Sequence, residues 1–462
     1  MSDPSSRLSE DSRVTILGSA LSGTAAARLA RARGARVFVS EVGEGPEQIA
    51  AAELLRAEGI EVETGGHDID RILDSDLVVV SPGINPATEV RRALRRAGVQ
   101  AIAEIELAFR ELRSRVIGIT GTNGKTTTSA MTGHLLETAG VSSVTAGNIG
   151  RPLSDVALME EQPDWVVVEV SSFQLADIDS FAPDIGIILN LSPDHLDRYR
   201  DLDSYYEDKR RLFANAADDS RWVLNGDEPA VVELANGAAG QRYLFSTAGE
   251  VESGAYRDPK GMLRLVLPDR KAKWLRDSEL QLVGSHNVSN ALAAALAAAL
   301  AGCADKKIAQ GLASFEPLPH RLQPVADFED VLWVNDSKST NVSAAAVAIE
   351  AFEQPVILLL GGRHKGESYT TLLPRMEDHV RAVIAFGEAA PQIISEMQDK
   401  VPDLQVAAGL ESAVRMAAQL ANSGDVVLLS PACSSYDMFP NYEARGRAFE
   451  ANVQQLHSVA QG

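Results

Sequence analysis

Short runs of apolar, mostly β-branched residues alternate along the chain with longer stretches in which apolar residues recur at helical spacing. The short runs indicate buried strands, and the stretches between them indicate helices. Parallel strands need helical crossovers, so this alternation predicts an α/β fold with doubly wound parallel sheets. The expected strands are residues 14–18, 35–41, 76–81, 116–119, 165–170, 185–191, 331–334, 356–361, 382–387 and 426–430.

Two stretches interrupt the alternation and predict domain boundaries. A charged helix is expected at residues 104–115, and the segment PLPHRL at residues 317–322 is a rigid, proline-rich joint. We therefore expect a Rossmann-like domain at residues 1–112, a central domain with a parallel sheet of the phosphate-loop ATPase type at 113–318, and a second Rossmann-like domain at 319–462.

A glycine-rich turn separates an apolar strand from a helix in the sequence VIGITGTNGKTTTSAM, which begins at Val116. Glycines allow backbone N–H groups to close around phosphate oxygens, and the helix that follows points its positive end at the same anion. In such a loop Lys125 reaches the β- and γ-phosphates, and the Thr126 hydroxyl holds Mg²⁺. A purely structural turn is the alternative, but the strand–loop–helix context favours a nucleoside triphosphate site.

Polar residues follow two further strands of the same region. Glu169 ends the strand at 165–170, and His195 comes just after the strand at 185–191. In a parallel sheet these ends share an edge with the phosphate loop, where a carboxylate holds Mg²⁺ and a histidine suits a second metal or the transferring phosphoryl group. The alternatives are a solvated glutamate and a capping histidine. Lys209, on an amphipathic helix expected at 203–214, is by default exposed.

The last third of the chain carries polar loops without a phosphate loop of its own. Asn287 and Asn290 share one face of a helical turn, where they either cap the helix or bind a purine base. Lys338, Lys365 and Ser435 follow expected strands and suit anionic groups, although such residues are often simply solvated. Their repeated placement after strands favours a binding site.

Composition limits the class of protein. The 462 residues are 45% hydrophobic and 23% charged, and the net charge of −21 repels a nucleic-acid backbone. Two cysteines cannot build a disulfide framework, and the polar N-terminus lacks the apolar core of a signal sequence. The longest apolar run, 291–301, is too short to cross a bilayer. We expect a cytoplasmic protein that binds no nucleic acid and does not insert into membranes.

Motifs spread over nearly the whole chain resemble those of the Mur ligases. GTNGKTT is shared across that superfamily, and EVSSFQL, SPDHLDRY, LPHRL, NDSKSTN and SPACSSYDMFPNYEARGRAF are more specific; SSFQL and SPACSS are similar to the D-glutamate-adding member. The resemblance implies a monomeric enzyme of peptidoglycan precursor synthesis that uses ATP and two Mg²⁺ ions. It would phosphorylate the carboxylate of UDP-N-acetylmuramoyl-L-alanine, and D-glutamate would attack the acyl phosphate to form an amide.

The resemblance also implies roles for individual residues. Those expected to bind ATP are Gly121, Thr122, Asn123, Gly124, Lys125, Thr126, Thr127, Asn287, Asn290, Arg321 and Asp336. Those expected to bind metal are Thr126, Glu169, His195 and Lys209, the last as a carbamylated lysine, which revises its default exposure; Lys125, Glu169, His195 and Lys209 would be catalytic. Those expected to bind the nucleotide-sugar substrate are Leu21, Ser22, Ser81, Gly83 and Asn148. Those expected to bind D-glutamate are Thr340, Lys365, Ser435 and Tyr442, and Lys338 is a further residue expected to bind substrate.

Some positions depart from the family pattern. Ala20 replaces a glycine of the first strand–helix turn, Glu41-Val42-Gly43 replaces an aspartate followed by polar or basic residues, and Tyr442 stands where phenylalanine is expected. Two other functions remain open on the sequence. One is a ligase of the same superfamily with another acceptor, and the other is a binding protein in which ATP drives a domain switch without forming a bond.

Overall fold

The computed structural model describes residues 8, 11–195, 198–282, 284–377 and 379–460. The described chain divides into two compact units. The first contains the chain up to Leu191 together with Asp203–Leu275 and Ala291–Leu312, and the second contains Ser192–Leu202, Arg276–Asn290 and the chain from Ala313 onward. Short internal segments therefore belong to a different unit from their neighbours in sequence. Leu196 and Asp197 of the SPDHLDRY motif lie outside the described residues.

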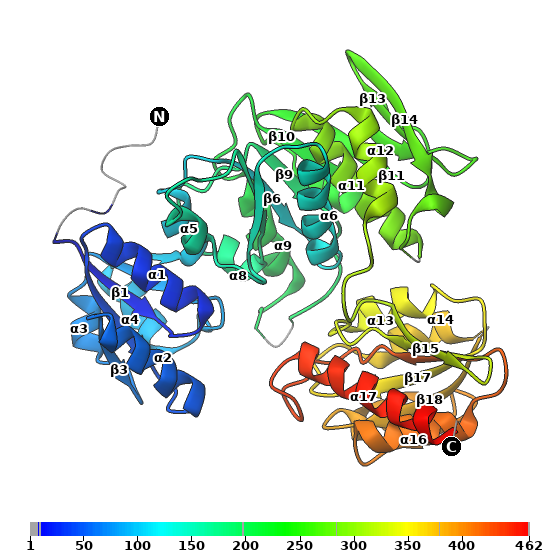
Figure 1. The fold of residues 1–462 in the computed structure, drawn as a ribbon. Helices are drawn as coiled ribbons and strands as arrows, with labels where there is room; N and C mark the ends of the chain where they lie inside the picture. Colours follow the sequence, from blue (N-terminus) through cyan, green and yellow to red (C-terminus); the bar gives the residue numbers. More distant parts are fainter. Residues whose placement is uncertain (1–7, 9–10, 196–197, 283, 378, 461–462) are drawn as a thin grey trace. The chain divides into compact units, whose positions relative to one another are not determined.

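The N-terminal part of the first unit is a parallel sheet with strand order β3-β2-β1-β4-β5 (Figure 1). Its strands are β1 Arg13–Leu17, β2 Arg36–Glu41, β3 Glu61–Thr64, β4 Leu77–Val80 and β5 Ala101–Ala103. Its helices are α1 Leu21–Ala32, α2 Pro46–Ala57, α3 Ile69–Leu73 and α4 Glu89–Ala97. The strand order reverses between β1 and β4, where open α/β sheets bind their ligands.

The central part of the first unit has strand order β14-β13-β12-β11-β10-β9-β6-β8-β7. Its strands are β6 Arg115–Thr120, β7 Ser143–Gly147, β8 Trp165–Glu169, β9 Ile185–Ile188, β10 Arg221–Asn225, β11 Gln241–Ser246, β12 Gly254–Arg257, β13 Met262–Leu267 and β14 Arg270–Arg276. Pairing is parallel from β7 to β12 and becomes antiparallel at β13. The strand of the phosphate loop, β6, lies between β8 and β9.

The helices between Lys125 and Ser314 are α6 Lys125–Thr138, α7 Leu153–Ala157, α8 Ser172–Leu175, α9 Leu202–Arg210, α10 Pro229–Leu234, α11 Ser285–Leu300 and α12 Asp305–Ser314, with 3₁₀ turns η2 Arg211–Phe213 and η3 Asp277–Glu279. Of these, η3 and the residues of α11 up to Asn290 belong to the second unit. The helix expected at 203–214 thus ends early, because its last turn tightens into η2. The helix expected at 104–115 is also too long. It is α5, Glu104–Phe109, since the chain must extend again for β6 at Arg115.

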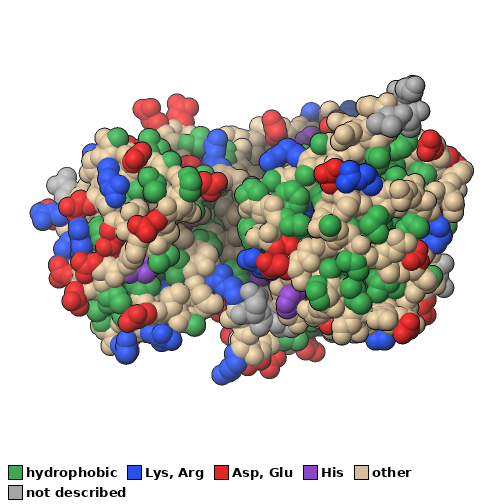
Figure 2. Space-filling view, turned by 90° about the horizontal axis from the view of Figure 1, so that it is seen from below, with side chains coloured by type: hydrophobic (Ala, Val, Ile, Leu, Met, Phe, Trp, Pro, Cys, Tyr) green, Lys and Arg blue, Asp and Glu red, His purple; other side chains and the backbone are tan. Residues whose placement is uncertain are grey.

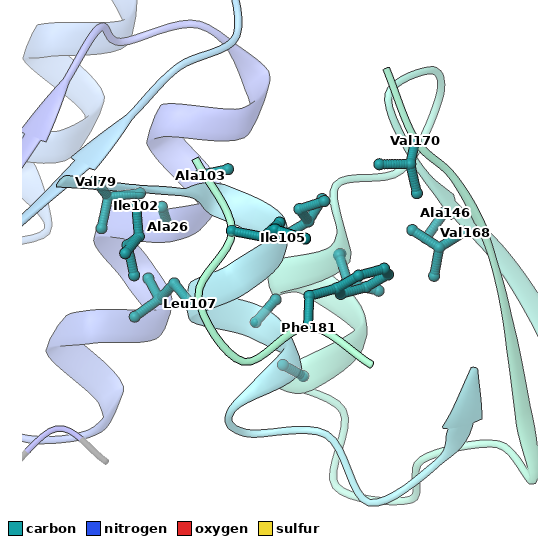
Figure 3. Close-up of a cluster of buried hydrophobic side chains, with 14 of the residues drawn as sticks. Ala26, Val79, Ile102, Ala103, Ile105, Leu107, Ala146, Val168, Val170 and Phe181 are labelled. Atoms are coloured by element: carbon teal, nitrogen blue, oxygen red, sulfur yellow. The ribbon is translucent and has the colours of Figure 1, made fainter. Parts of the chain in front are cut away.

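Helix α5 joins the two sheets of the first unit through a shared core. Ile105 and Leu107 are buried in one cluster with Ile102 of β5 and Phe181 of the central part. Figure 3 shows Leu107 beside Ile102 and Phe181 beside Ile105. Burial of several such side chains stabilises by about 1.5–3 kcal/mol each, so α5 is a packed connection between these two parts rather than a loose linker.

The sheet of the second unit has strand order β15-β16-β20-β17-β18-β19, parallel except for the β15–β16 pair. Its strands are β15 Gln323–Phe328, β16 Val331–Asn335, β17 Val356–Gly361, β18 Val380–Phe386, β19 Leu404–Val406 and β20 Val426–Leu429. Its helices are α13 Val342–Ile349, α14 Leu373–Met376, α15 Ala390–Met397, α16 Leu410–Leu420 and α17 Tyr442–Ala460, with the 3₁₀ turn η4 Tyr369–Leu372. Separate hydrophobic cores cover its two faces.

The α/β fold expected from the sequence is confirmed. The exact domain boundaries at 112/113 and 318/319 remain predictions. Among the described residues, no helix is long and apolar enough to cross a membrane.

Candidate functional site

The phosphate loop closes between β6 and α6, as the sequence predicts. Gly121 and Gly124 have φ of 151° and 81°, and Gly124 is the left-handed residue directly before α6. Both conformations disfavour residues with a Cβ. The Lys125 side chain folds back over the loop, with Nζ 2.9 Å from Gly121 O and 2.8 Å from Thr122 O. The loop thus has the backbone shape and the cation of a phosphate site.

A residue that the sequence analysis did not select, Asn190, fastens this loop. Its side-chain oxygen accepts a hydrogen bond from Asn123 N at 2.7 Å, its amide donates to Asn123 O at 3.1 Å, and its backbone oxygen accepts from Thr122 N at 3.0 Å. The signal was available: Asn190 is a polar residue just after the apolar strand β9, which neighbours the phosphate-loop strand.

Lys209 is buried, with 1% of its surface exposed, so the default expectation of an exposed lysine is wrong. Its Nζ donates to Gly121 O at 2.8 Å and lies 4.5 Å from the ring centre of Tyr205. Helix α9 therefore places a second lysine against the phosphate loop beside Lys125. This placement is compatible with the role in phosphate or metal binding that the family resemblance implies.

Glu169 lies at the end of β8, next to the phosphate-loop strand, and only 2% of it is exposed. Its side-chain oxygen accepts a hydrogen bond from Asn148 Nδ2 at 3.1 Å, and its backbone oxygen accepts from Asn148 N at 2.8 Å. A residue expected to bind the nucleotide-sugar, Asn148, and one expected to bind metal, Glu169, are therefore in direct contact. The alternative of a solvated Glu169 is wrong.

His195 belongs to the second unit, whereas Glu169 and Lys209 belong to the first. Its backbone has φ of 57°, an uncommon conformation for a residue with a Cβ and one often found at functional sites. Its Nε2 lies 3.6 Å from Asp194 Oδ2, and its N–H donates to Asp194 Oδ1 at 2.8 Å. The expected metal group of His195 and Lys209 includes residues of both units and remains a prediction.

Asp194 is the centre of a polar cluster that the sequence analysis missed. Lys365 Nζ lies 3.3 Å from its Oδ1, and Asn341 Nδ2 donates to its Oδ2 at 2.9 Å. Asn341 also caps α13, because its side-chain oxygen accepts from Ala344 N at 2.8 Å. Asp194 lies 147 positions from Asn341 and 171 positions from Lys365 in sequence, so only the folded chain reveals the cluster.

The loops after β17 and β20 are joined by backbone hydrogen bonds. Arg363 N donates to Ser434 O at 2.9 Å, and Ser434 N donates to Arg363 O at 3.0 Å. This bridge brings the loop of Lys365 and the loop of Ser435 to the same sheet edge, as the sequence predicts. Ser435 is buried there, with 3% exposed.

Lys338 and Tyr442 also meet, with Lys338 Nζ 3.8 Å from the Tyr442 ring centre. Thr340 follows Lys338 in the loop that leads into α13. Ser337 Oγ, next to Lys338, donates to Tyr442 O and also accepts from the fully buried Arg445, which ties this loop to the start of α17. The expected D-glutamate residues therefore lie on loops of one unit that are bonded to one another.

Four of the residues expected to bind ATP also lie in the second unit: Asn287, Asn290, Arg321 and Asp336. Asn290 Nδ2 donates to Asn287 Oδ1 at 3.2 Å, so the two amides do share a face. Burial raises the pKa of Asp336 to about 7, against hydrogen bonds from Ser430 Oγ and Leu322 N and the nearby charge of Arg321.

Four of the expected nucleotide-sugar residues lie at the carboxyl ends of β1 and β4, and the fifth, Asn148, follows β7. Leu21 and Ser22 open α1, and Ser81 and Gly83 follow β4. Ser81 Oγ is buried without a hydrogen-bond partner among the described residues. The departure at Glu41 is accommodated locally, because its carboxylate accepts from Ser19 N at 2.8 Å, Ser19 Oγ at 2.9 Å and Gly43 N at 2.7 Å.

The donors near the phosphate loop suit Mg²⁺. Across the described residues, no group of three or more His, Cys, Asp and Glu side chains is arranged to hold a metal ion. Mg²⁺ nevertheless binds commonly through one or two protein oxygens together with substrate phosphates and water. The Thr126 hydroxyl, in the first turn of α6, and the Glu169 carboxylate, at the end of β8, are oxygen donors of that kind.

The first unit has a phosphate loop with two lysines and a glutamate at the end of the neighbouring strand. The second unit has loops that suit anionic groups. Together these features are those of a multidomain, nucleotide-dependent enzyme of the α/β class. Comparison with known proteins identifies the family. Residues 13–90 match the MurD N-terminal domain, residues 119–298 the Mur ligase middle domain, and residues 320–433 the Mur ligase glutamate ligase domain.

Full-length relatives agree. The chain is 43% identical over 96% of its length, and 98% of the relative's, to the UDP-N-acetylmuramoylalanine–D-glutamate ligase of Salinibacter ruber. It is 41% identical to the enzyme of that name from Acidobacterium capsulatum, over 95% of both chains. The chain therefore belongs to the Mur ligase family, within its group of D-glutamate ligases, and is an enzyme. The family expected from the sequence motifs is confirmed.

Solved structures share the fold at low sequence identity. A pseudomurein peptide ligase type C from Methanothermus fervidus is 19% identical, with TM-score 0.62 over 96% of this chain and all of that one. A UDP-N-acetylmuramate-alanine ligase from Thermotoga maritima is also 19% identical, with TM-score 0.59 over 96% and 99%. Both likenesses concern the fold alone.

Proposed function

We propose that the chain is an ATP-dependent ligase that adds D-glutamate to UDP-N-acetylmuramoyl-L-alanine in cytoplasmic peptidoglycan precursor synthesis, acting as a monomer. The observation that carries the proposal is the phosphate loop on β6 with the buried carboxylate of Glu169 on the neighbouring strand β8. The names of the full-length relatives support the choice of both substrates.

The reaction would take place in two steps. An oxygen of the alanyl carboxylate attacks the γ-phosphorus of ATP, ADP leaves, and an acyl phosphate forms. The amine of D-glutamate then attacks the carbonyl carbon and loses a proton; the C–O bond to phosphate breaks and an amide remains. The first step needs positive charge around the transferring phosphoryl group. Lys125 would supply it.

Residues of both units would hold the substrates. The nucleotide-sugar would lie against Leu21, Ser22, Ser81, Gly83 and Asn148. The nucleotide would lie against Gly121–Thr127, Asn287, Asn290, Arg321 and Asp336. D-Glutamate would lie against Thr340, Lys365, Ser435 and Tyr442, and Lys338 would be a further substrate-binding residue.

Thr126 and Glu169 would hold one Mg²⁺, and His195 with a carbamylated Lys209 would hold a second. Carbamylation converts a cation into a carboxylate, which allows it to approach a metal. When bound, the ions would neutralise charge on the phosphates.

The test is phosphate release with ATP, Mg²⁺ and UDP-N-acetylmuramoyl-L-alanine, compared for D-glutamate, L-glutamate, L-alanine and no acceptor. We expect release only with D-glutamate and its loss on chelation of Mg²⁺. Lys125→Ala should lower the rate at least about 100-fold, since it removes a cation from the phosphoryl site. Equal release with every acceptor would contradict the assignment, and release without any acceptor would favour the ATP-driven switch.

A further inference from the structure

Asp194 and Lys365 form a largely buried ion pair, with 6% and 16% of their side chains exposed. Asp194 already has its oxygens occupied, since it also accepts from Asn341 Nδ2 at 2.9 Å and from His195 N at 2.8 Å. Both oxygens of the Asp194 carboxylate therefore already have partners within the protein, and its role is to fix the position of Lys365. A ligand that enters this cluster must find its acceptor elsewhere.

Glu367, two residues after Lys365, is the second carboxyl group of the cluster. Its Oε1 is buried and has no hydrogen-bond partner among the described residues. Burial, together with the charge of Asp194, raises the pKa of this carboxyl to about 7, while Lys365 and a hydrogen bond from Val342 N oppose the shift. Buried polar atoms almost always have a partner, so this oxygen indicates one that arrives with a ligand.

The charges of the cluster match those of an acidic amino acid. Such a molecule carries two carboxylates and one ammonium group. Lys365 and the Ser435 hydroxyl are donors on the two loops that the Arg363–Ser434 bridge joins, and donors suit carboxylates. Glu367 is the acceptor with an unused oxygen, and an acceptor with negative charge suits an ammonium group.

Resting on the proposed D-glutamate ligase function, we propose that the Glu367 carboxylate binds the ammonium group of incoming D-glutamate while Lys365 and Ser435 hold its carboxylates. The nitrogen bound in this way is the atom that forms the new amide bond. The ammonium group first loses one proton to solvent, which frees the lone pair that attacks the acyl phosphate, and the second proton leaves as the amide forms. Glu367 thereby selects amino acids over dicarboxylic acids of the same length, and it presents the nucleophile.

Glu367→Gln tests this charge, because glutamine keeps the size of the side chain and the acceptor for Val342 N. With D-glutamate at pH 8 we expect KM to rise at least tenfold, while KM for ATP and for the nucleotide-sugar stays within twofold. Glutarate has the two carboxylates without the amine, so its Ki as a competitive inhibitor should stay equal or fall. Glu353→Gln, an exposed substitution just before β17, is the matched control and should change none of these.

Two results would overturn the inference while leaving the ligase function standing. One is a Glu367→Gln enzyme whose KM for D-glutamate stays within twofold of wild type. The other is an equal loss of D-glutamate and glutarate binding, which means that Glu367 only supports the fold. A wild-type enzyme that does not use D-glutamate would instead overturn the function and the inference together.

The wild-type enzyme gives an independent readout if the variant fails to fold. As pH rises from 6 to 8 Glu367 ionises, so KM for D-glutamate should fall while Ki for glutarate rises. The charged and titratable groups facing it are Asp194, Lys365 and Tyr369. Because both ligands meet these same groups, parallel changes for the two would contradict a role of Glu367 toward the amine.

Discussion

Two buried glutamates of α5, two positions apart, ionise differently because their hydrogen bonds differ. Burial alone would raise the pKa of Glu106, but bonds from Ser180, Arg110 and backbone N–H groups outweigh it and lower the pKa. Glu104 accepts from Ser154 alone of the groups that lower its pKa, and its Oε2 is without a partner among the described residues. Burial therefore raises its pKa to about 7.

Glu104→Gln should stabilise the protein at alkaline pH. The folded-state pKa lies above the unfolded value of 4.5, so this group's contribution to stability falls as pH rises from 4.5 to about 7. The penalty above pH 7 is about 3 kcal/mol. Glutamine removes it at the cost of an unpaired amide, about 1 kcal/mol. We expect a gain of about 2 kcal/mol at pH 8 and a small loss at pH 4.5, measured by urea unfolding. A gain that does not depend on pH would contradict the assignment.

Asn190→Ala should loosen the phosphate loop. It removes the two side-chain bonds to Asn123, each worth about 1 kcal/mol, and the loop must then be ordered by ATP itself. KM for ATP should rise by up to about 30-fold, while KM for D-glutamate stays unchanged. Asn215→Ala, which also removes two side-chain-to-backbone bonds but far from the loop in sequence, is the control. Equal KM values for the two variants would count against this role of Asn190.

At the scale of elements, a side chain from another motif packs so closely against α17 that one position of this helix must be a glycine. Gly446 lies inside this helix, and a Cβ there would stand 2.3 Å from His320 Nδ1 of the LPHRL motif. His320 is held in place, since its Nδ1 lies 2.8 Å from Asn335 Nδ2 and 3.3 Å from Glu450 Oε1. The glycine of YEARGRAF is thus required by packing between motifs.

Gly446→Ala should destabilise the second unit although alanine favours helices. The propensity gain is about 1 kcal/mol, whereas overpacking a fixed ring costs about 1–3 kcal/mol and also strains its hydrogen bonds. We expect a net loss of about 1–2 kcal/mol in urea unfolding. In Gly249→Ala the added Cβ has nothing within 4 Å, so that variant should be close to neutral. A stabilised Gly446→Ala protein would show that the ring moves freely.

Local patterns predicted the parallel strands and the phosphate loop, because burial and backbone shape depend on neighbours in sequence. The burial of Lys209 was not predictable in that way, since its partner Gly121 lies 88 positions away. The same holds for Asp194 with Lys365 and for Gly446 with His320. Such contacts depend on topology, which a single sequence does not display.

At the scale of the whole molecule, the chain passes between its two units at several points rather than once. Ser192–Leu202 and Arg276–Asn290 belong to the second unit, although the residues on both sides of each belong wholly or mainly to the first. On the face that Figure 2 displays, acidic and basic side chains are interspersed. The second unit therefore includes Ser192–Leu202, a short segment from the middle of the sequence.

Asn341→Ala should release that segment in the intact protein. It removes the bond to Asp194 Oδ2 and the cap of α13, which is worth about 1 kcal/mol. Trypsin should then cut after Arg198 or Arg200 several times faster than in wild type, measured by mass spectrometry of early fragments. Asn452→Ala, which loses only a bond within α17, should keep the wild-type rate. Unchanged cleavage in Asn341→Ala would mean that other contacts hold the segment.

The passage of Ser192–Leu202 into the second unit has a consequence for recombination between ligases. A hybrid enzyme joined at residue 313 would take Asn341 and Lys365 from one parent and Asp194 from the other. In such a hybrid the two partners of the Asp194–Lys365 ion pair, beside the proposed acceptor site, come from different parents even when both halves fold. Exchange of acceptor preference between parents therefore requires a three-piece graft in which residues 192–202 travel with the C-terminal half.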